Sequence, residues 1–421
     1  MKRRSGRIDR ISSLPNDVLA HVLSFLSTRD AVRTCVLSKR WRNTWTIVPV
    51  LNFNFYEFPT ELVSEDEDDD IDENIKEELK FDSFVRSVLE NRGPSHLDTV
   101  TFRGEFMSHF YEPSMRWLDR SALLMPRVIS AMIPVFEQKE LNLPDSVFSC
   151  ASLELLELIH CPYNGTAYLK QDSIALTSLK TIKLVNLALD DDFARKLLLG
   201  CPVLENLRLF DCILCISDIS SNVLKELILD DCWLYQHMRI SCPALVSLLF
   251  TSCENTIRII SLENMTSLVY ATIDLSGSDD EEVFDNLPKL KLLSGLLNAT
   301  YLKLLFHPLP ELKEQLENDI SNCGTFYNLK ILRIGAWNMV KHFSLLALFL
   351  ERCPVLKQLA LLLNRAVIQE MPRQDVSFQI EYIEKVNILC DEEKLAIKLV
   401  QLLGRHVKTM GNINVWKYLD G

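Results

Sequence analysis

Cysteine, histidine and aspartate are the residues of this sequence that could carry chemistry. The 12 cysteines are enough for a redox centre or a zinc site, and Cys212 and Cys215 form a Cys-x-x-Cys pair. A zinc site of that kind needs a second pair at matching spacing, which the sequence lacks. Packing is therefore the role that we expect for this pair, and an enzyme that uses it is a remote alternative.

Most of the cysteines keep a fixed distance from a pattern of leucines. Four stand three residues before the leucine that opens a repeat: Cys150, Cys201, Cys242 and Cys353. Four more stand three residues after the residue that closes a repeat: Cys161, Cys212, Cys232 and Cys253. A position locked to a repeat is typical of a small, buried packing residue.

Motifs of catalytic sites are missing from the sequence. It contains no glycine-rich nucleotide loop, no Gly-x-Ser-x-Gly and no His-Glu-x-x-His. Its 8 histidines leave open a triad built from distant residues, but nothing places a nucleophile, a base and an orienting group together. The aspartates at 190–192 and 230–231 could bind a cation or a basic partner, although such residues more often form turns. We expect no enzymatic activity, no cofactor and no metal.

The composition describes a folded protein with an acidic balance. Of its 421 residues, 48% are hydrophobic, and the net charge is −12. This charge disfavours a general binder of nucleic acid or of anionic membranes. The longest apolar run, residues 343–350, is too short to span a bilayer, and the basic N-terminus lacks the apolar run of a signal peptide. We expect a protein of the cytoplasm, the nucleus or both, without nucleic acid or membrane as a partner.

The leucines belong to a repeat of the type Leu-x-x-Leu-x-Leu. Its copies are Leu153/Leu156/Leu158, Leu179/Ile182/Leu184, Leu204/Leu207/Leu209, Leu224/Leu227/Leu229, Leu245/Leu248/Phe250, Leu268/Ala271/Ile273, Leu329/Leu332/Ile334 and Leu356/Leu359/Leu361, with a looser copy at Leu97/Val100/Phe102. The first six strict copies follow one another at 20 to 26 residues, which is typical of leucine-rich repeats. Each repeat would supply one short strand whose inward leucines stack on those of the next. The sequence predicts an open α/β solenoid, with residues 106–135 and most of 273–329 left without a clear repeat phase.

The stretch from Asp9 to Trp45 precedes the repeats and predicts three short helices. Ser13, Thr28 and Ser38 are the expected N-caps. A unit of roughly 40 residues is near the lower limit of independent stability, and these helices carry more apolar surface than they can bury among themselves. Something else must cover the remainder.

This stretch strongly resembles the F-box of the plant F-box/leucine-rich-repeat/FBD family. The resemblance is carried by Leu14-Pro15 ahead of an amphipathic helix and by the run Ser38-Lys-Arg-Trp41. It implies that the excess apolar face docks onto a Skp-type adaptor. The docking residues that it implies are Leu14, Pro15, Leu19, Val22, Leu23, Leu26, Ser38, Trp41 and Trp45. Two other interpretations are a helical bundle packed on the rest of the chain and a helix-turn-helix that presents its basic residues to DNA.

The C-terminal tail predicts a strand over 376–380, a second over 386–389, a helix over 391–406 and a last strand over 412–418. It resembles the FBD domain that closes such repeat arrays, although the family's usual glycine is absent at Cys390-Asp391. The expected domains are an F-box at 9–50, a leucine-rich-repeat solenoid at 51–370 with an acidic loop at 64–74, and an α+β FBD-like cap at 371–421.

The function implied by the resemblance is that of a substrate-recognition adaptor in an SCF-type (cullin–RING) E3 ubiquitin ligase. The F-box would hold the Skp-type adaptor and the repeat surface a protein substrate, while the chain itself would catalyse no covalent step. The alternative is a repeat scaffold or sequestering protein that acts outside a ligase. The sequence does not identify the substrate.

Overall fold

The structure, a computed structural model, describes residues 11–416 except 12, 59–69, 94, 105–109, 135–139, 162–165, 253–259, 276–290, 307–309, 338–342, 364–379, 391–392 and 406. The chain forms two compact units. Unit 1 consists of Met1–Ala188 with Leu199–Leu204, and unit 2 of Leu189–Leu198 with Glu205–Gly421. Among the residues described, no helix combines the length and the apolar composition needed to cross a membrane.

Unit 1 begins with a helical module over residues 11–49, here called the N-terminal module. Its helices are α1 (Asn16–Leu23), α2 (Thr28–Arg33), the 3-10 turn η1 (Thr34–Val36) and the 3-10 helix η2 (Trp41–Ile47). The three predicted N-caps are wrong, because Pro15, Ser27 and Arg40 hold those positions. Ser27 caps α2 by accepting a hydrogen bond of 3.2 Å from the backbone N–H of Asp30.

The third helix of the module differs from the predicted α-helix in its pitch. A 3-10 helix has three residues per turn, so residues three apart share a face. Trp41 and Thr44 are accordingly buried in η2, and Ile47 packs against the same core. An α-helix would place Trp45 on the same side as Trp41, four residues earlier, but in η2 Trp45 is turned partly outward and is half-buried.

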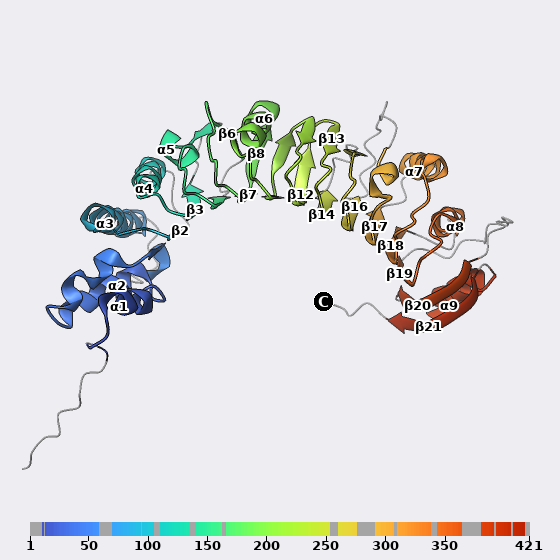
Figure 1. The fold of residues 1–421 in the computed structure, drawn as a ribbon, viewed down its shortest axis with the longest axis horizontal. Coiled ribbons are helices and arrows are strands. Elements are labelled where there is room, and N and C mark those ends of the chain that lie inside the picture. Colours follow the sequence, from blue (N-terminus) through green and yellow to red (C-terminus); the bar gives the residue numbers. More distant parts are fainter. Residues whose placement is uncertain are drawn as a thin grey trace, which may run out of the picture. The chain divides into compact units, whose positions relative to one another are not determined.

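A parallel ladder of strands continues unit 1. It comprises β1 (Val50–Asn54), β2 (Thr99–Arg103), β3 (Val128–Pro134), β5 (Leu155–Cys161) and β7 (Thr181–Val185). The 3-10 turn η3 (Phe55–Glu57) follows β1, and β3 lies in the region that the leucine pattern left unphased. The helices α3 (Asp70–Asn91), α4 (Tyr111–Leu123) and α5 (Asp145–Phe148) lie along one side of this ladder (Figure 1). A second set of parallel strands consists of β4 (Glu140–Asn142), β6 (Ala167–Lys170) and β8 (Leu187–Asp190).

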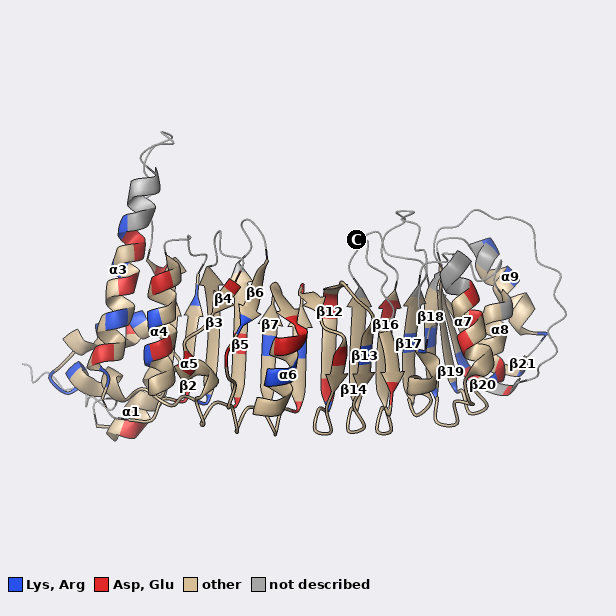
Figure 2. Ribbon diagram, turned by 90° about the horizontal axis from the view of Figure 1, so that it is seen from above, with Lys and Arg blue, Asp and Glu red and all other residues tan. Residues whose placement is uncertain are grey.

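The helix α3 begins inside the segment that the sequence predicted as an acidic loop. It starts at Asp70 and so includes the last acidic residues of that run, while residues 64–69 lie outside the described part of the chain. Carboxylates favour the first turn of a helix because they interact with its partial positive charge. Acidic and basic residues alternate along the described part of α3 (Figure 2).

Unit 2 contains a longer parallel ladder. Its strands are β9 (Asn206–Phe210), β12 (Glu226–Leu234), β14 (Ser247–Ser252), β16 (Tyr270–Leu275), β17 (Tyr301–Phe306), β18 (Ile331–Trp337), β19 (Gln358–Leu363), β20 (Ile380–Leu389) and β21 (Val407–Trp416). Short strands β11 (Asp218–Ser220), β13 (Met238–Ser241) and β15 (Ile260–Glu263) form a separate parallel sheet, and β10 (Ile213–Cys215) pairs with β12. The return segments hold α7 (Pro310–Asn322), α8 (Phe343–Glu351), α9 (Glu393–Leu403) and the 3-10 turn η5 (Leu293–Leu296). The helix α6 (Asp191–Gly200) follows β8 directly.

In each unit, the core is a column formed by the predicted repeat residues. Every residue of the nine copies named above is buried. Because the copies lie in register on parallel strands, each inward side chain contacts its equivalents in the neighbouring repeats. This confirms the leucine-rich-repeat assignment.

The C-terminal tail continues the same ladder. In unit 2, Leu359 of β19, Val386 of β20 and Ile413 of β21 lie side by side on parallel strands, at intervals of 27 residues. The predicted strand at 386–389, the helix and the last strand correspond to β20, α9 and β21, although β20 and β21 are longer than predicted and are arranged like the preceding repeats. Most of the predicted strand at 376–380 lies outside the described residues.

Candidate functional site

The N-terminal module has a small core of its own. Leu19, Leu23, Ala31, Trp41 and Val48 are buried together with Ala20, and Leu14 packs against them from the edge. Trp41 is the largest side chain in this core, and it enters because η2 turns it inward. The core fixes how α1, α2 and η2 present their outer faces.

The nine residues implied for adaptor docking fall into three groups. Leu19, Leu23 and Trp41 are buried in the core, so in this arrangement they support a docking surface from behind. Leu14 and Trp45 are half-buried at its edge. The exposed members are Pro15, Val22, Leu26 and Ser38. Contact of any of the nine with an adaptor stays a prediction.

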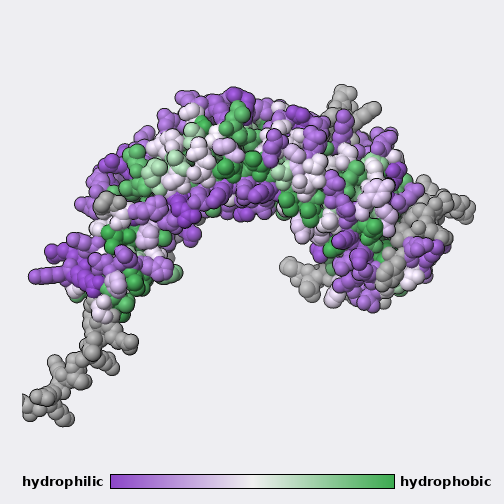
Figure 3. Space-filling model, in the orientation of Figure 1, coloured by the Kyte–Doolittle hydropathy of each residue, from purple (hydrophilic) through white to green (hydrophobic). Residues whose placement is uncertain are grey.

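Further apolar side chains reach the surface of the module and were missed from the sequence. They are Val18, Phe25, Val36 and Leu37, and Phe25 is 77% exposed and Val36 82% exposed. Apolar surface is visible on this part of the chain in Figure 3. The signal was present in α1, because Val18, Val22 and Phe25 are spaced by four and three residues and so lie along one stripe. A module this small that leaves such side chains in water has the composition of a binding surface.

Arg40 connects the two parts of the sequence that carried the resemblance. Its guanidinium donates to the carbonyl O of Leu14 and to Oδ1 of Asn16, the latter at 3.1 Å. Nothing in the sequence indicated this contact. The contact holds the Leu-Pro segment against the start of η2, so the two signatures form one side of the module.

The module is fused to the first strand of the ladder within unit 1. The Thr28 hydroxyl accepts a hydrogen bond of 2.6 Å from the backbone N–H of Asn52 in β1. The N–H of Gly93 donates to the carbonyl O of Thr46, at 3.1 Å. Phe53 of β1 stacks on Phe102 of β2, with ring centroids 5.2 Å apart. Hydrogen bonds thus join the module to β1 and to Gly93, while apolar side chains such as Phe25 stay exposed.

Comparison with known proteins assigns both the module and the repeats. The F-box domain matches residues 11–53, and the LRR repeats of the FBD-associated F-box protein At5g56370 match residues 116–279. F-box/LRR-repeat protein At3g58900 of Arabidopsis thaliana is 32% identical over 64% of this chain and 80% of its own length. The chain belongs to the plant F-box/leucine-rich-repeat/FBD family. F-box/LRR-repeat protein 13 and F-box/FBD/LRR-repeat protein At1g78750, also from Arabidopsis thaliana, are each 27% identical, over 95% and 84% of this chain and 87% and 77% of their own lengths.

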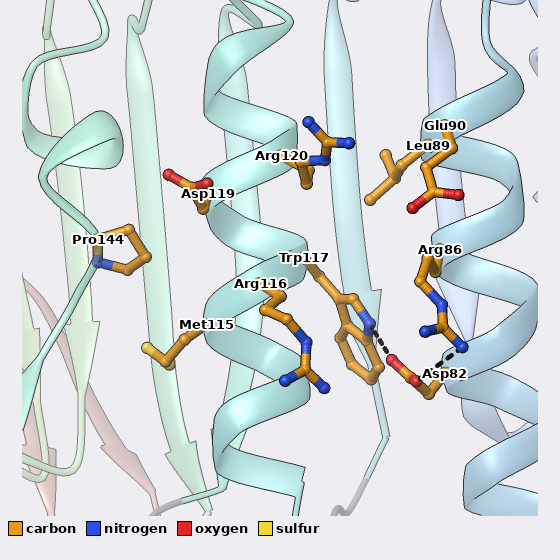
Figure 4. A pocket seen from close by; sticks show the side chains of 10 residues that line it. All are labelled: Asp82, Arg86, Leu89, Glu90, Met115, Arg116, Trp117, Asp119, Arg120 and Pro144. Atoms are coloured by element: carbon orange, nitrogen blue, oxygen red, sulfur yellow. Dashed lines mark hydrogen bonds and ion pairs between the residues drawn. The ribbon is translucent and has the colours of Figure 1, made fainter.

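Beyond the F-box, unit 1 contains a pocket of about 500 Å³ between α3 and α4 (Figure 4). The indole N–H of Trp117 donates to Oδ1 of Asp82 at 2.9 Å, and Arg86 lies 3.7 Å from the other carboxylate oxygen. Figure 4 shows these side chains turned toward one another across the two helices. The ten described residues that line the pocket include no serine, cysteine or histidine, and its carboxylates are those of Asp82, Glu90 and Asp119. Its polar contacts join α3 to α4.

The phase-locked cysteines whose side chains the structure describes are buried packing residues. Burial raises the pKa of the thiol to about 12 in Cys201 and to about 11 in Cys242, and it also raises the pKa of Cys353. Cys323, which is outside that set, is buried too, and its pKa is raised to about 11. Raised pKa values suppress the reactive thiolate form. In the pair considered for redox chemistry, Cys212 is fully buried and only Cys215 is partly exposed. For the residues that the structure describes, no group of three histidine, cysteine or acidic side chains is arranged to hold a metal ion.

The aspartates considered as a cation site serve turns and caps instead. Asp190 accepts a hydrogen bond from the N–H of Phe193 at 2.9 Å, at the start of α6, and Asp191 accepts one from the N–H of Ser217 at 2.6 Å. Asp230 accepts from the hydroxyl of Thr251 at 2.7 Å. Each carboxylate satisfies a polar group of a turn or a neighbouring repeat, which is the role that aspartate has in such positions.

Proposed function

We propose that this protein is the substrate-recognition adaptor of an SCF-type ubiquitin ligase. The F-box docks onto a Skp-type adaptor, and the repeat array binds a protein substrate. The protein supplies binding and no covalent step. The observation that carries the proposal is the exposed apolar surface of an F-box whose own core is already filled.

Docking by this surface is favourable because apolar area leaves water. Burial of a side chain such as Leu or Phe contributes about 1.5–3 kcal/mol. Val18, Val22, Phe25 and Leu26 lie on α1 or just after it, so one partner groove can cover several of them. Helix-in-groove docking of this type uses residues spaced by three and four positions as anchors.

A tethered substrate gains from effective concentration. Once the F-box holds the adaptor, an enzyme loaded with ubiquitin on the same complex meets the substrate in a unimolecular step.

The predicted domain limits at 50 and 370 are part of this proposal, with one change at the C-terminal end. Because β20 and β21 extend the ladder of unit 2, we propose that the FBD-like tail acts as the last repeats of the array.

The test is the affinity of the purified chain for a Skp-type adaptor. The change Val22→Ser/Phe25→Ser/Leu26→Ser removes three exposed apolar side chains, and we expect it to weaken binding by about a hundredfold or more. The matched control, Leu123→Ser/Leu199→Ser, changes side chains that are 61% and 74% exposed outside the F-box, and it should bind as the unchanged chain does. Equal circular dichroism spectra would show that all three proteins are folded.

Two results would contradict the proposal. One is an unchanged chain that is folded and does not bind the adaptor at all. The other is a triple variant that binds as tightly as the control, which would place docking elsewhere. The first result would favour the alternative of a repeat scaffold that acts outside a ligase.

A further inference from the structure

A second surface of this chain has the composition of a recognition site: the open face of strands β16, β17 and β18 in unit 2. Four side chains define it, and we call them the Tyr–Arg patch: Tyr270, Tyr301, Lys303 and Arg333. Residues alternate between the two faces of a strand, and the intervening residues of these strands are buried. The patch therefore points away from the core. The register places Tyr270 beside Tyr301 and Lys303 beside Arg333.

In the aromatic half of the patch, Tyr270 is exposed, Tyr301 is half-buried, and the two rings are held in contact. The rings of Tyr270 and Tyr301 lie 6.3 Å apart at 48°, and the guanidinium of Arg333 lies 5.7 Å from the centre of the Tyr301 ring. Tyr270 is 55% exposed. Tyrosine and arginine are enriched among residues that dominate binding energy, because they offer large contact area and polar groups together. Side chains held in place before binding lose less entropy when a partner arrives.

The two cations of the patch differ from two other cations of the sheet faces, which are paired with carboxylates. Within unit 1, Lys183 pairs with Glu157 on the next strand at 2.8 Å, and within unit 2, Arg208 pairs with Glu226 at 2.6 Å. Among the described residues, neither Lys303 nor Arg333 has a carboxylate partner. Figure 2 labels β17 and β18, the strands on which Lys303 and Arg333 lie.

Within the described residues of β16 to β19, the patch is the positive part of an acidic protein. Among the described side chains on the open faces of these strands, one is acidic, Asp274. The chain as a whole carries a net charge of −12. The net negative charge of the chain therefore disfavours an acidic ligand in general, whereas the two cations of the patch attract it. This difference in attraction would direct an acidic ligand to the patch.

We propose that the Tyr–Arg patch binds an acidic segment of the protein substrate. Carboxylates of that segment pair with Lys303 and Arg333, and a neighbouring apolar or aromatic side chain packs on Tyr270 and Tyr301. The description of the bound protein as a substrate rests on the function proposed above. The composition of the bound segment rests on the patch alone.

The experiment is a selection of binding peptides from a random twelve-residue library displayed on phage, with the purified full-length chain as bait. We expect the selected peptides to be enriched in aspartate and glutamate beside an aromatic or aliphatic residue. Synthetic peptides made from them should bind at least tenfold more weakly to Lys303→Gln/Arg333→Gln, since a hydrogen bond to a charged group is worth a factor of about ten or more. Tyr270→Ala/Tyr301→Ala should weaken them as well.

The matched control is Lys183→Gln/Arg208→Gln, which removes the same two charges from sheet faces where they are already paired. It should leave peptide binding unchanged. Peptides that show no acidic enrichment, or acidic peptides that bind equally to the patch variant and the control, would overturn the proposal. Adaptor binding is measured on the same preparations. A chain that binds acidic peptides through the patch but binds no adaptor would retain this inference and lose the ligase function.

Discussion

At the scale of single residues, Asp319 shows how burial and hydrogen bonding compete. It is 8% exposed on α7, and its Oδ2 accepts hydrogen bonds from the N–H groups of Leu292 and Leu293 at 3.0 and 2.9 Å. Burial raises the pKa of Asp319, and the two backbone hydrogen bonds oppose that rise without cancelling it. The carboxylate anchors the turn η5 to α7, but its charged form is disfavoured because burial removes it from water.

This cost predicts a pH dependence of stability. With its pKa raised in the folded state, Asp319 holds a proton in the folded chain over a pH window in which the unfolded chain has lost it. The free energy of unfolding therefore falls as pH rises from the ordinary aspartate pKa to the raised value, and it stays lower above that window. Asp319→Asn keeps an oxygen acceptor and has no charge, so its melting temperature relative to the unchanged chain should rise across the same window. Melting curves at a series of pH values would check this, and parallel curves would contradict it.

Thiol reactivity is a second prediction at this scale. The fully buried cysteines, among them Cys201, Cys242 and Cys353, should resist a thiol reagent in the native chain, since their raised pKa values leave almost no thiolate. Cys35 and Cys215 are partly exposed and should react first among the described cysteines. Timed labelling followed by peptide mass analysis would give the order, and early labelling of Cys201 would contradict it.

At the scale of elements, the sequence predicted the strands well and the short helices poorly. Inward residues such as Leu156 and Leu158 decide which face of a strand is buried. Their spacing along the sequence indicates that face directly. The choice between an α-helix and a 3-10 helix shifts a side chain by one position, as Trp45 shows, and is decided by packing against Trp41 and its neighbours. For the same reason, the buried and exposed members of the expected docking set could not be separated from the sequence.

The repeat copies that the sequence missed have other residue types at the repeat positions. Ile383, Val386 and Ile388 occupy all three positions in and beside the predicted strand of β20, and they are fully buried. Ile129 and Ala131 occupy the second and third positions in β3 and are buried as well. A search for leucine overlooks such copies, although any apolar side chain of suitable volume fills the column.

The joint between the F-box and β1 gives a prediction for an element boundary. Thr28→Val removes the acceptor of the Asn52 N–H, and a buried donor left unpaired costs about 1–3 kcal/mol. Thr28→Ser keeps the hydroxyl and serves as the control. Hydrogen exchange at the Asn52 amide should accelerate in Thr28→Val and remain slow in Thr28→Ser. Equal protection in both variants would show that the hydrogen bond does not hold β1.

At the scale of the whole molecule, the two proposed binding surfaces are independent. The docking face belongs to the F-box in unit 1, and the Tyr–Arg patch belongs to unit 2. Substitutions at one surface should therefore leave affinity at the other unchanged, because the two surfaces share no residues and sites without shared partners act additively. The family, the repeat architecture and the docking module could be inferred from the sequence. The patch could not, because its residues come from three repeats and only the register of the strands brings them together.

The contact between the F-box and β1 also bears on how chimaeras of such proteins should be built. A junction at the end of η2 would join a foreign F-box to the β1 of this chain, and the hydrogen bond between Thr28 and the N–H of Asn52 would depend on the foreign residue at position 28. A junction after Asn54 would transfer β1 together with its own F-box and preserve this hydrogen bond. The F-box match itself extends to residue 53, into this strand. Chimaeras built in the laboratory should therefore be joined after Asn54, so that the helices of the F-box and β1 stay together.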